Sequence, residues 1–189
     1  MKKRLIQYNA PATLTFAIIS FAVLLLGVLT GGTSTMKLFC VYRSSLREVL
    51  TYPRFFTHVL GHSSFSHYSG NIMLMLVLGP TLEERYGSRT IFVTMVITAF
   101  ISGLVQWLFF PNTALLGASG IVFMMILMAS LGGSRGKGLP LTLILVFIIY
   151  VGGEIYAGIT ARDNISHLTH IIGGICGAVM GANLRKKKK

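Results

Sequence analysis

The chain has 189 residues, of which 53% are hydrophobic and only 12% are charged, and its formal net charge is +12. A composition this apolar excludes an ordinary soluble domain and predicts a polytopic membrane protein. The excess of basic residues does not by itself indicate nucleic acid, because the run Lys186 to Lys189 lies close after the last apolar segment and would face anionic membrane lipid there.

Six apolar runs follow one another along the chain and predict an all-α fold of six transmembrane helices. They cover residues 13–29, 67–82, 91–110, 115–131, 139–157 and 166–182. A span needs roughly 20 residues, so the chain has no room for a separate soluble domain. We therefore expect a single membrane domain over residues 1–189, with residues 1–12 as an N-terminal segment and residues 183–189 as a basic tail.

The distribution of basic residues predicts the orientation of the six helices. Cytoplasmic loops carry an excess of Lys and Arg. With the N-terminus inside, 12 of the 17 basic residues fall on the cytoplasmic side. The opening Met1-Lys2-Lys3-Arg4 resembles a signal peptide, but no Ala-x-Ala site follows it closely, which favours a retained first helix. Both termini are therefore expected in the cytoplasm.

Several polar side chains interrupt the apolar runs at one common depth. A reactive or ionisable group inside a bilayer is energetically costly and is by default a functional hypothesis. Counting about 1.5 Å per helical residue across a core of about 30 Å places Ser119 and His170 roughly 8 to 10 Å below the outer surface. The same count places His67 about 6 Å and Asn71 about 12 Å deep. These four groups are therefore expected to converge in the outer leaflet.

The sequence around Ser119 suits a nucleophile. At the start of a helix, free backbone N–H groups and the positive end of the helix dipole would face an oxyanion formed there. The alternative is that Gly117-Ala118-Ser119-Gly120 is only a helix cap with small residues for packing. Phe123, four residues later, shares the face of Ser119 and would either stack on an imidazole or pack in the core.

His170 is the candidate general base. Gly173, Gly177 and Gly181 follow it at a spacing that lets another helix approach closely, as proton transfer from a serine would require. His167 lies one turn earlier on the same face, so helical spacing alone does not separate the two histidines. His170 is preferred because it lies deeper.

Taken together, these motifs resemble those of the rhomboid intramembrane serine proteases. Gly117-Ala118-Ser119-Gly120 is similar to the nucleophile motif of that family, His170 with Gly174 and Gly177 to its catalytic histidine helix, and His67 with Asn71 to its His-x-x-x-Asn element. The segment from Arg54 to His62 resembles the approach to the second helix of bacterial members. The resemblance covers residues 51–181, although Pro53-Arg54 stands where many members have Trp-Arg.

The resemblance implies an endopeptidase that cleaves transmembrane protein substrates through an acyl-enzyme. Ser119 would be the nucleophile and His170 the base, while His67, Asn71 and the backbone N–H of Ser119 would hold the oxyanion. Gly117, Gly120, Gly174, Gly177 and Phe123 would support the site. The site would face the outer leaflet of the cell membrane, and the reaction would need no cofactor or metal.

Other functions are weighed against this one. His58, His62 and His67 are not joined by a carboxylate or cysteine, which disfavours a metal site. A non-catalytic rhomboid-like protein that binds transmembrane helices, or a small transporter, would use the same polar cavity. Relatives of the first kind typically lack the serine or the histidine, whereas this chain has both, and this chain lacks the inverted repeat expected of many transporters. Glu154 is not assigned to the site, Cys40 and Cys176 are not expected to pair, and Trp107 is expected to be an interfacial anchor.

Overall fold

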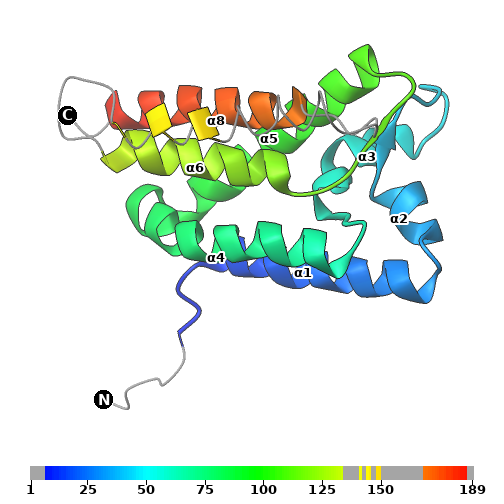
Figure 1. Cartoon of the computed structure of the whole chain (residues 1–189), viewed down its shortest axis with the longest axis horizontal. Helices are drawn as coiled ribbons and strands as arrows, with labels where there is room; N and C mark the ends of the chain where they lie inside the picture. Colours follow the sequence, from blue (N-terminus) through cyan, green and yellow to red (C-terminus); the bar gives the residue numbers. More distant parts are fainter. Residues whose placement is uncertain (1–6, 134–140, 142–143, 146–147, 150–167, 187–189) are drawn as a thin grey trace.

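The structure, a computed structural model, describes residues 7–133, 141, 144–145, 148–149 and 168–186. Most of these residues are helical. The long helices are α1 (Pro11–Leu29), α4 (Phe65–Tyr86), α5 (Ser88–Phe109), α6 (Ser119–Gly133) and α8 (Leu168–Lys186). Figure 1 shows α1 beside α4, and α6 beside α8, with α5 contacting both pairs.

Short elements fill the connection between α1 and α4. They are α2 (Thr33–Leu38), β1 (Val41–Tyr42), α3 (Thr51–Thr57) and the 3-10 helix η1 (His58–Leu60). β1 pairs in antiparallel fashion with β2 (Ala114–Leu115), with Val41 opposite Leu115 and Tyr42 opposite Ala114. The pairing ties the connection after α1 to the segment that leads into α6. We name residues 33–60 together with residues 110–115 the outer segment.

Five of the six predicted helices are present, with shifted ends. The predicted fourth helix, residues 115–131, is wrong at its start, because Leu115 belongs to β2 and the helix begins at Ser119. Gly117 has a φ of +118°, which is incompatible with a right-handed helix and ends the extended segment in a turn. The predicted fifth helix, residues 139–157, lies almost entirely outside the described residues, as does Glu154.

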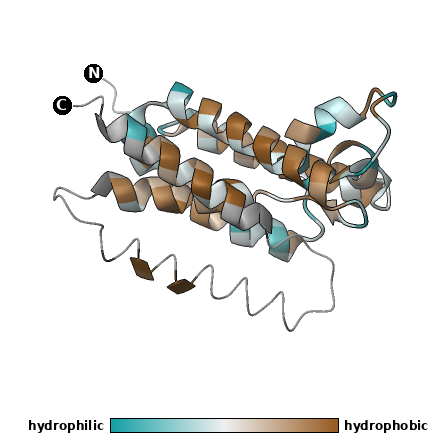
Figure 2. Cartoon of the chain, turned by 90° about the horizontal axis from the view of Figure 1, so that it is seen from above, coloured by the Kyte–Doolittle hydropathy of each residue, from teal (hydrophilic) through white to brown (hydrophobic). Residues whose placement is uncertain are grey.

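Two of the described helices are long and apolar enough to cross a membrane, judged by length and composition. They are α1 and α5, and α6 contains a shorter apolar stretch, Ser119–Leu131. Large hydrophobic side chains point outward from the first two, for example Val28 on α1, 72% exposed, and Phe92 on α5, 58% exposed. Figure 2 shows hydrophobic residues along the helices and polar residues mainly near their ends. Such outward apolar faces suit contact with lipid.

A buried carboxylate fixes the start of α1. Glu83 on α4 accepts hydrogen bonds from the backbone N–H groups of Ala12 and Thr13, at 3.1 and 2.8 Å, and from the Thr13 hydroxyl at 2.7 Å. The first N–H groups of a helix have no partner within it, and a negative charge there also meets the positive end of the helix dipole. The prediction placed the start of this helix at residue 13, but Pro11 occupies its first position, where a missing N–H costs nothing.

Candidate functional site

Ser119 is the first residue of α6 and is half-buried. The chain reaches it through Gly117, whose backbone N–H donates a 2.9 Å hydrogen bond to the carbonyl oxygen of His58 in η1. The N–H of Val122 pairs with the carbonyl of Ala118 and closes the first turn of the helix. The positive φ of Gly117 therefore sets the angle at which the chain enters α6, and the bond to His58 holds that turn against the outer segment.

His67 and Asn71 project from α4 toward the same turn. They lie four residues apart and so share one face of the helix. A Cβ atom placed on Gly117 would lie 2.7 Å from Nε2 of His67 and 4.0 Å from Nδ2 of Asn71. The Asn71 amide also donates a 3.1 Å hydrogen bond to the carbonyl of His67. Both side chains thus reach the backbone two residues before Ser119, and only glycine fits at position 117.

Local contacts at the start of α4 orient His67. The Ser64 hydroxyl caps the helix by accepting a 3.1 Å hydrogen bond from the backbone N–H of His67. The hydroxyl of Ser63 lies 3.2 Å from Nδ1 of the same imidazole. The ring of His62 stands edge-on to that of His67, with 5.0 Å between centroids.

The sequence pointed to neither Ser63 nor His62 as part of this region. A serine directly before a helix cap carries no distinctive pattern, and His62 entered the sequence analysis only as a disfavoured metal ligand and as the end of the segment from Arg54 that resembles bacterial rhomboids. His62 is 3% exposed, and its Nδ1 donates to the carbonyl of Leu60 at 3.2 Å. Burial, followed by the nearby His67, lowers the pKa of His62 to about 4, so this ring is neutral at pH 7. A neutral ring can pack against His67 without charge repulsion.

Helix α8 packs against α6 through glycines. A Cβ on Gly173 would collide with the carbonyl oxygen of Gly120, and a Cβ on Gly177 with that of Met124. From the first contact to the second, the residue number rises by four on both helices. The two helices therefore run parallel, as Figure 1 also shows. His170 lies one turn before Gly173 on α8, which puts its backbone at the level of the turn that leads into α6. The structure describes no side chain for His170, and His167 lies outside the described residues.

Phe123 lies between these two helices. Its side chain is 1% exposed, and its ring occupies the space that a Cβ on Gly174 would need. Gly174 is one turn after His170, so the ring packs directly beyond the position of the candidate base. Gly117, Gly120, Gly174 and Gly177 are thus all points of close approach. The spacing of Gly173 and Gly177 predicted such an approach for the last helix, and both show it.

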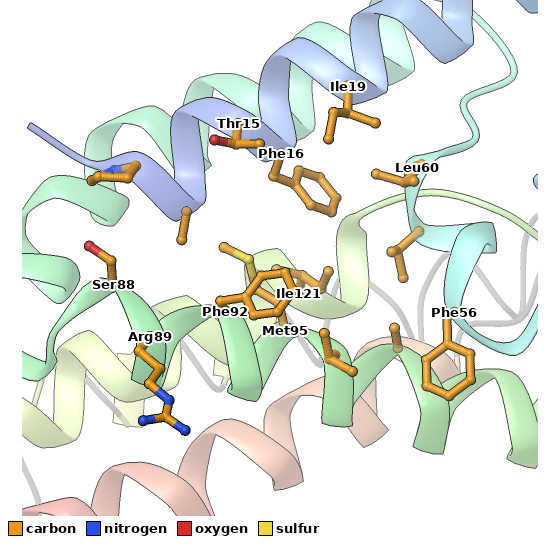
Figure 3. A pocket seen from close by; sticks show the side chains of 15 residues that line it. Thr15, Phe16, Ile19, Phe56, Leu60, Ser88, Arg89, Phe92, Met95 and Ile121 are labelled. Atoms are coloured by element: carbon orange, nitrogen blue, oxygen red, sulfur yellow. The ribbon is translucent and has the colours of Figure 1, made fainter. Parts of the chain in front are cut away.

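A cavity of about 480 Å³ lies elsewhere in the described part of the molecule, between α1 and α5. Figure 3 shows Phe16 and Ile19 of α1 facing Phe92 and Met95 of α5 across it. Its lining is mainly apolar, and it includes none of the candidate site residues. The cavity and the candidate site are therefore distinct regions.

Comparison with known proteins agrees with the motifs. The family model described as the rhomboid domain matches residues 50–187. The chain is 30% identical over 154 residues to Rhomboid protease GlpG of Serratia proteamaculans (strain 568), covering 79% of this chain and 54% of that protein. It is 30% identical over 175 residues to Rhomboid protease GlpG of Yersinia pestis (strain Pestoides F), covering 90% of this chain and 61% of that protein.

A more distant match extends beyond bacteria. Rhomboid-related protein 1 of Caenorhabditis elegans is 28% identical over 138 residues, covering 68% of this chain and 38% of that protein. The chain thus matches between about two fifths and three fifths of the length of these relatives. The family model alone spans well over half of the chain, and the chain belongs to the rhomboid family of membrane proteins.

Proposed function

We propose that this chain is an intramembrane serine endopeptidase in which Ser119 and His170 form the catalytic dyad. The observation that carries the proposal is the approach of His67 and Asn71 to Gly117, two residues before a serine at a helix start. α4 and the turn into α6 meet there, and α8 packs on α6 close by, which supports a reaction that needs a nucleophile, a base and oxyanion donors together.

In the proposed reaction, the Ser119 hydroxyl attacks the carbonyl carbon of the scissile peptide bond while its proton passes to the His170 imidazole. The carbonyl oxygen becomes an oxyanion, which accepts hydrogen bonds from the Ser119 N–H, the Asn71 amide and Nε2–H of His67. Collapse of this intermediate breaks the C–N bond, and the His170 proton moves to the leaving amine. Water then attacks the acyl-enzyme, with His170 again acting as base, and releases the new carboxyl group.

The close packing of α8 on α6 supports the choice of His170. Parallel helices in contact at Gly173 and Gly177 keep their backbones near one another one turn earlier. At that level α8 carries His170, and the facing chain makes the turn at Gly117 that leads into α6 and Ser119. Any side chain at Gly173 would separate the two helices and lengthen the path for the proton.

The proposal extends to substrate and location. The substrates are transmembrane segments of membrane proteins, cleaved by a six-span protein of the cell membrane with both termini in the cytoplasm and the site toward the outer leaflet. The outward apolar faces of α1 and α5, and the protease names of the bacterial relatives, support this assignment. The proposed reaction uses no cofactor.

Cleavage of a single-span reporter in liposomes tests the function. Wild type is expected to cut it and to react with a fluorophosphonate probe at one serine. Ser119→Ala and His170→Ala should lose both activities, whereas Ser66→Ala, which alters an exposed serine on α4, should retain them. Asn71→Ala should keep Ser119 in place but lower kcat by about 10²- to 10³-fold, the effect of losing one oxyanion donor.

The result that would overturn the dyad is equally specific. A folded wild-type protein that neither cuts nor labels, yet still captures the reporter helix, would indicate a non-catalytic rhomboid-like binder. Retention of cleavage in His170→Ala with loss in His167→Ala would move the base one turn along the chain.

A further inference from the structure

The imidazole of His67 has two nitrogens with different surroundings. Nε2 faces Gly117 and the turn into α6, whereas Nδ1 lies 3.2 Å from the hydroxyl oxygen of Ser63. A neutral imidazole carries one hydrogen, and the hydrogen bond made by one nitrogen determines whether the other is a donor or an acceptor. The direction of the contact between Ser63 and Nδ1 therefore bears on whether Nε2 is a donor or an acceptor.

Only one of the two tautomers suits the site. With the hydrogen on Nε2, the ring presents a donor to an oxyanion formed near Ser119. With the hydrogen on Nδ1, it presents a lone pair, which would repel that oxygen. A hydroxyl can donate or accept, so Ser63 stabilises the first tautomer when its O–H donates to Nδ1.

We propose that Ser63 is a positioning residue that donates to Nδ1 of His67 and so keeps the Nε2 hydrogen directed toward the turn before Ser119. This inference rests on the proposed function, in which His67 binds the oxyanion. Ser63 precedes the helix cap Ser64, and the two neighbouring serines bind different groups of His67. Ser64 binds the backbone N–H of His67, and Ser63 binds its ring.

The packing around the ring limits its rotation about χ2. His62 stands edge-on to His67, at an interplanar angle of 73°, and His62 is itself held edge-on to the ring of Tyr68 at 88°. The Nδ1–H group of His62 donates to the carbonyl oxygen of Leu60. In the neutral His62 ring, Nε2 therefore carries no hydrogen. The contact with His62, which Tyr68 holds in turn, favours one orientation of the His67 ring, and in this proposal Ser63 then selects its tautomer.

The experiment compares Ser63→Ala with Ser63→Thr in the full-length protein in liposomes. Ser63→Ala should lower kcat on the reporter about fivefold, as expected for one hydrogen bond of ordinary net strength, and leave KM unchanged. Ser63→Thr keeps a hydroxyl and should restore kcat. Ser64→Ala removes the helix cap and should lower the unfolding temperature, while its kcat stays above that of Ser63→Ala.

A spectroscopic measurement separates positioning from folding. The ¹⁵N shifts of the His67 ring, assigned with His67→Gln, should indicate the Nε2–H tautomer in wild type and Ser63→Thr, and an increased share of Nδ1–H in Ser63→Ala. A wild-type ring with the hydrogen on Nδ1, or a Ser63→Ala protein with unchanged tautomer and unchanged kcat, would overturn the inference while leaving the proposed function intact. A wild type without cleavage or probe labelling would overturn the proposed function first, and with it the oxyanion role of His67.

Discussion

The outer segment and the α6–α8 interface lie on two sides of the candidate site and are stabilised in different ways. In the outer segment, side chains bind backbone groups: Arg54 donates to the Lys37 carbonyl at 2.8 Å and pairs with Glu48 at 2.9 Å. At the α6–α8 interface, glycines let one helix press against the backbone of the other.

The contrast follows from where backbone hydrogen bonds are made. A long helix satisfies its own N–H and C=O groups, so two helices need only shape to pack in an apolar medium. Irregular chain does not satisfy them, and the outer segment needs polar side chains to do so. The site combines both solutions, since Gly117 pairs with His58 of the outer segment and leads into the glycine-packed helix.

The largest expected effect is at the helix interface. Gly173→Leu would drive a side chain into the Gly120 carbonyl, which belongs to backbone and cannot rotate away. We expect a loss of about 3 kcal/mol in the free energy of unfolding, the upper range for overpacking, and no probe labelling of Ser119. Ile175→Leu, at a side chain 59% exposed on α8, is the matched control. Normal labelling in Gly173→Leu would mean that close contact is unnecessary.

A smaller effect is expected in the outer segment. Arg54 is 2% exposed and its guanidinium lies 4.6 Å from the centroid of the Tyr42 ring. Arg54→Met would keep much of the packing volume but leave the Lys37 carbonyl without its donor. Because Glu48 is 41% exposed and screened by solvent, the expected cost is about 2 kcal/mol rather than that of a fully buried ion pair.

Thermal unfolding in detergent would measure this cost, with Arg47→Met at an exposed position as control. Equal unfolding temperatures for the two variants would show that the buried arginine adds nothing. If the contrast between the regions holds, Arg54→Met should retain α6–α8 contact, as measured by a cross-link between the helices, whereas Gly173→Leu should lose it.

Lowering the pH should destabilise the outer segment before it destabilises the α6–α8 interface. Burial lowers the pKa of His58 to about 4, partly offset by the bond of its Nε2 to the Ala99 carbonyl, and the value in the unfolded chain is about 6.5. The unfolded state therefore binds more protons between these values, and stability falls as the pH drops from about 6.5 toward 4. Unfolding measured at pH 7, 5.5 and 4.5 should show this decline.

The matched variant for that measurement is His58→Gln, which keeps a donor but does not titrate. Its stability should fall less steeply over the same pH range, with His62 accounting for part of the remaining slope because burial lowers its pKa in the same direction. Identical slopes for wild type and a variant lacking both histidines would contradict the assignment.

The sequence predicted the regular part of the molecule better than the irregular part. Helical periodicity and the spacing of His67 and Asn71 depend on neighbours along the chain, and both helix and shared face are present. The pairing of Val41 with Leu115 and the carboxylate of Glu83 at the start of α1 depend on residues far apart in sequence. No local sequence pattern indicates such long-range contacts. For this reason the predicted fourth helix starts four residues before α6 does, and the short elements have no counterpart in the prediction.

The smallest expected effect concerns Trp107, which the sequence predicted as an interfacial anchor. Its indole N–H donates to the Ser44 carbonyl at 3.0 Å, and the Arg43 guanidinium lies 4.5 Å from the ring centroid. The residue therefore also ties the end of α5 to the outer segment. Trp107→Phe keeps an aromatic ring but loses the donor, and should cost about 1 kcal/mol of unfolding free energy.

Leu108→Ala is the matched control for Trp107→Phe, because its side chain is 44% exposed and only its backbone carbonyl binds Arg43. If Trp107 acts only as an anchor in the membrane interface, Trp107→Phe should change the depth of α5 in the bilayer. Amide hydrogen exchange in the outer segment should then be the same as in wild type. If it ties α5 to the outer segment, exchange should instead rise around Arg43 and Ser44. That increase should be smaller than in Arg54→Met, because Trp107 supplies one donor to the segment where Arg54 supplies both a donor and a charge.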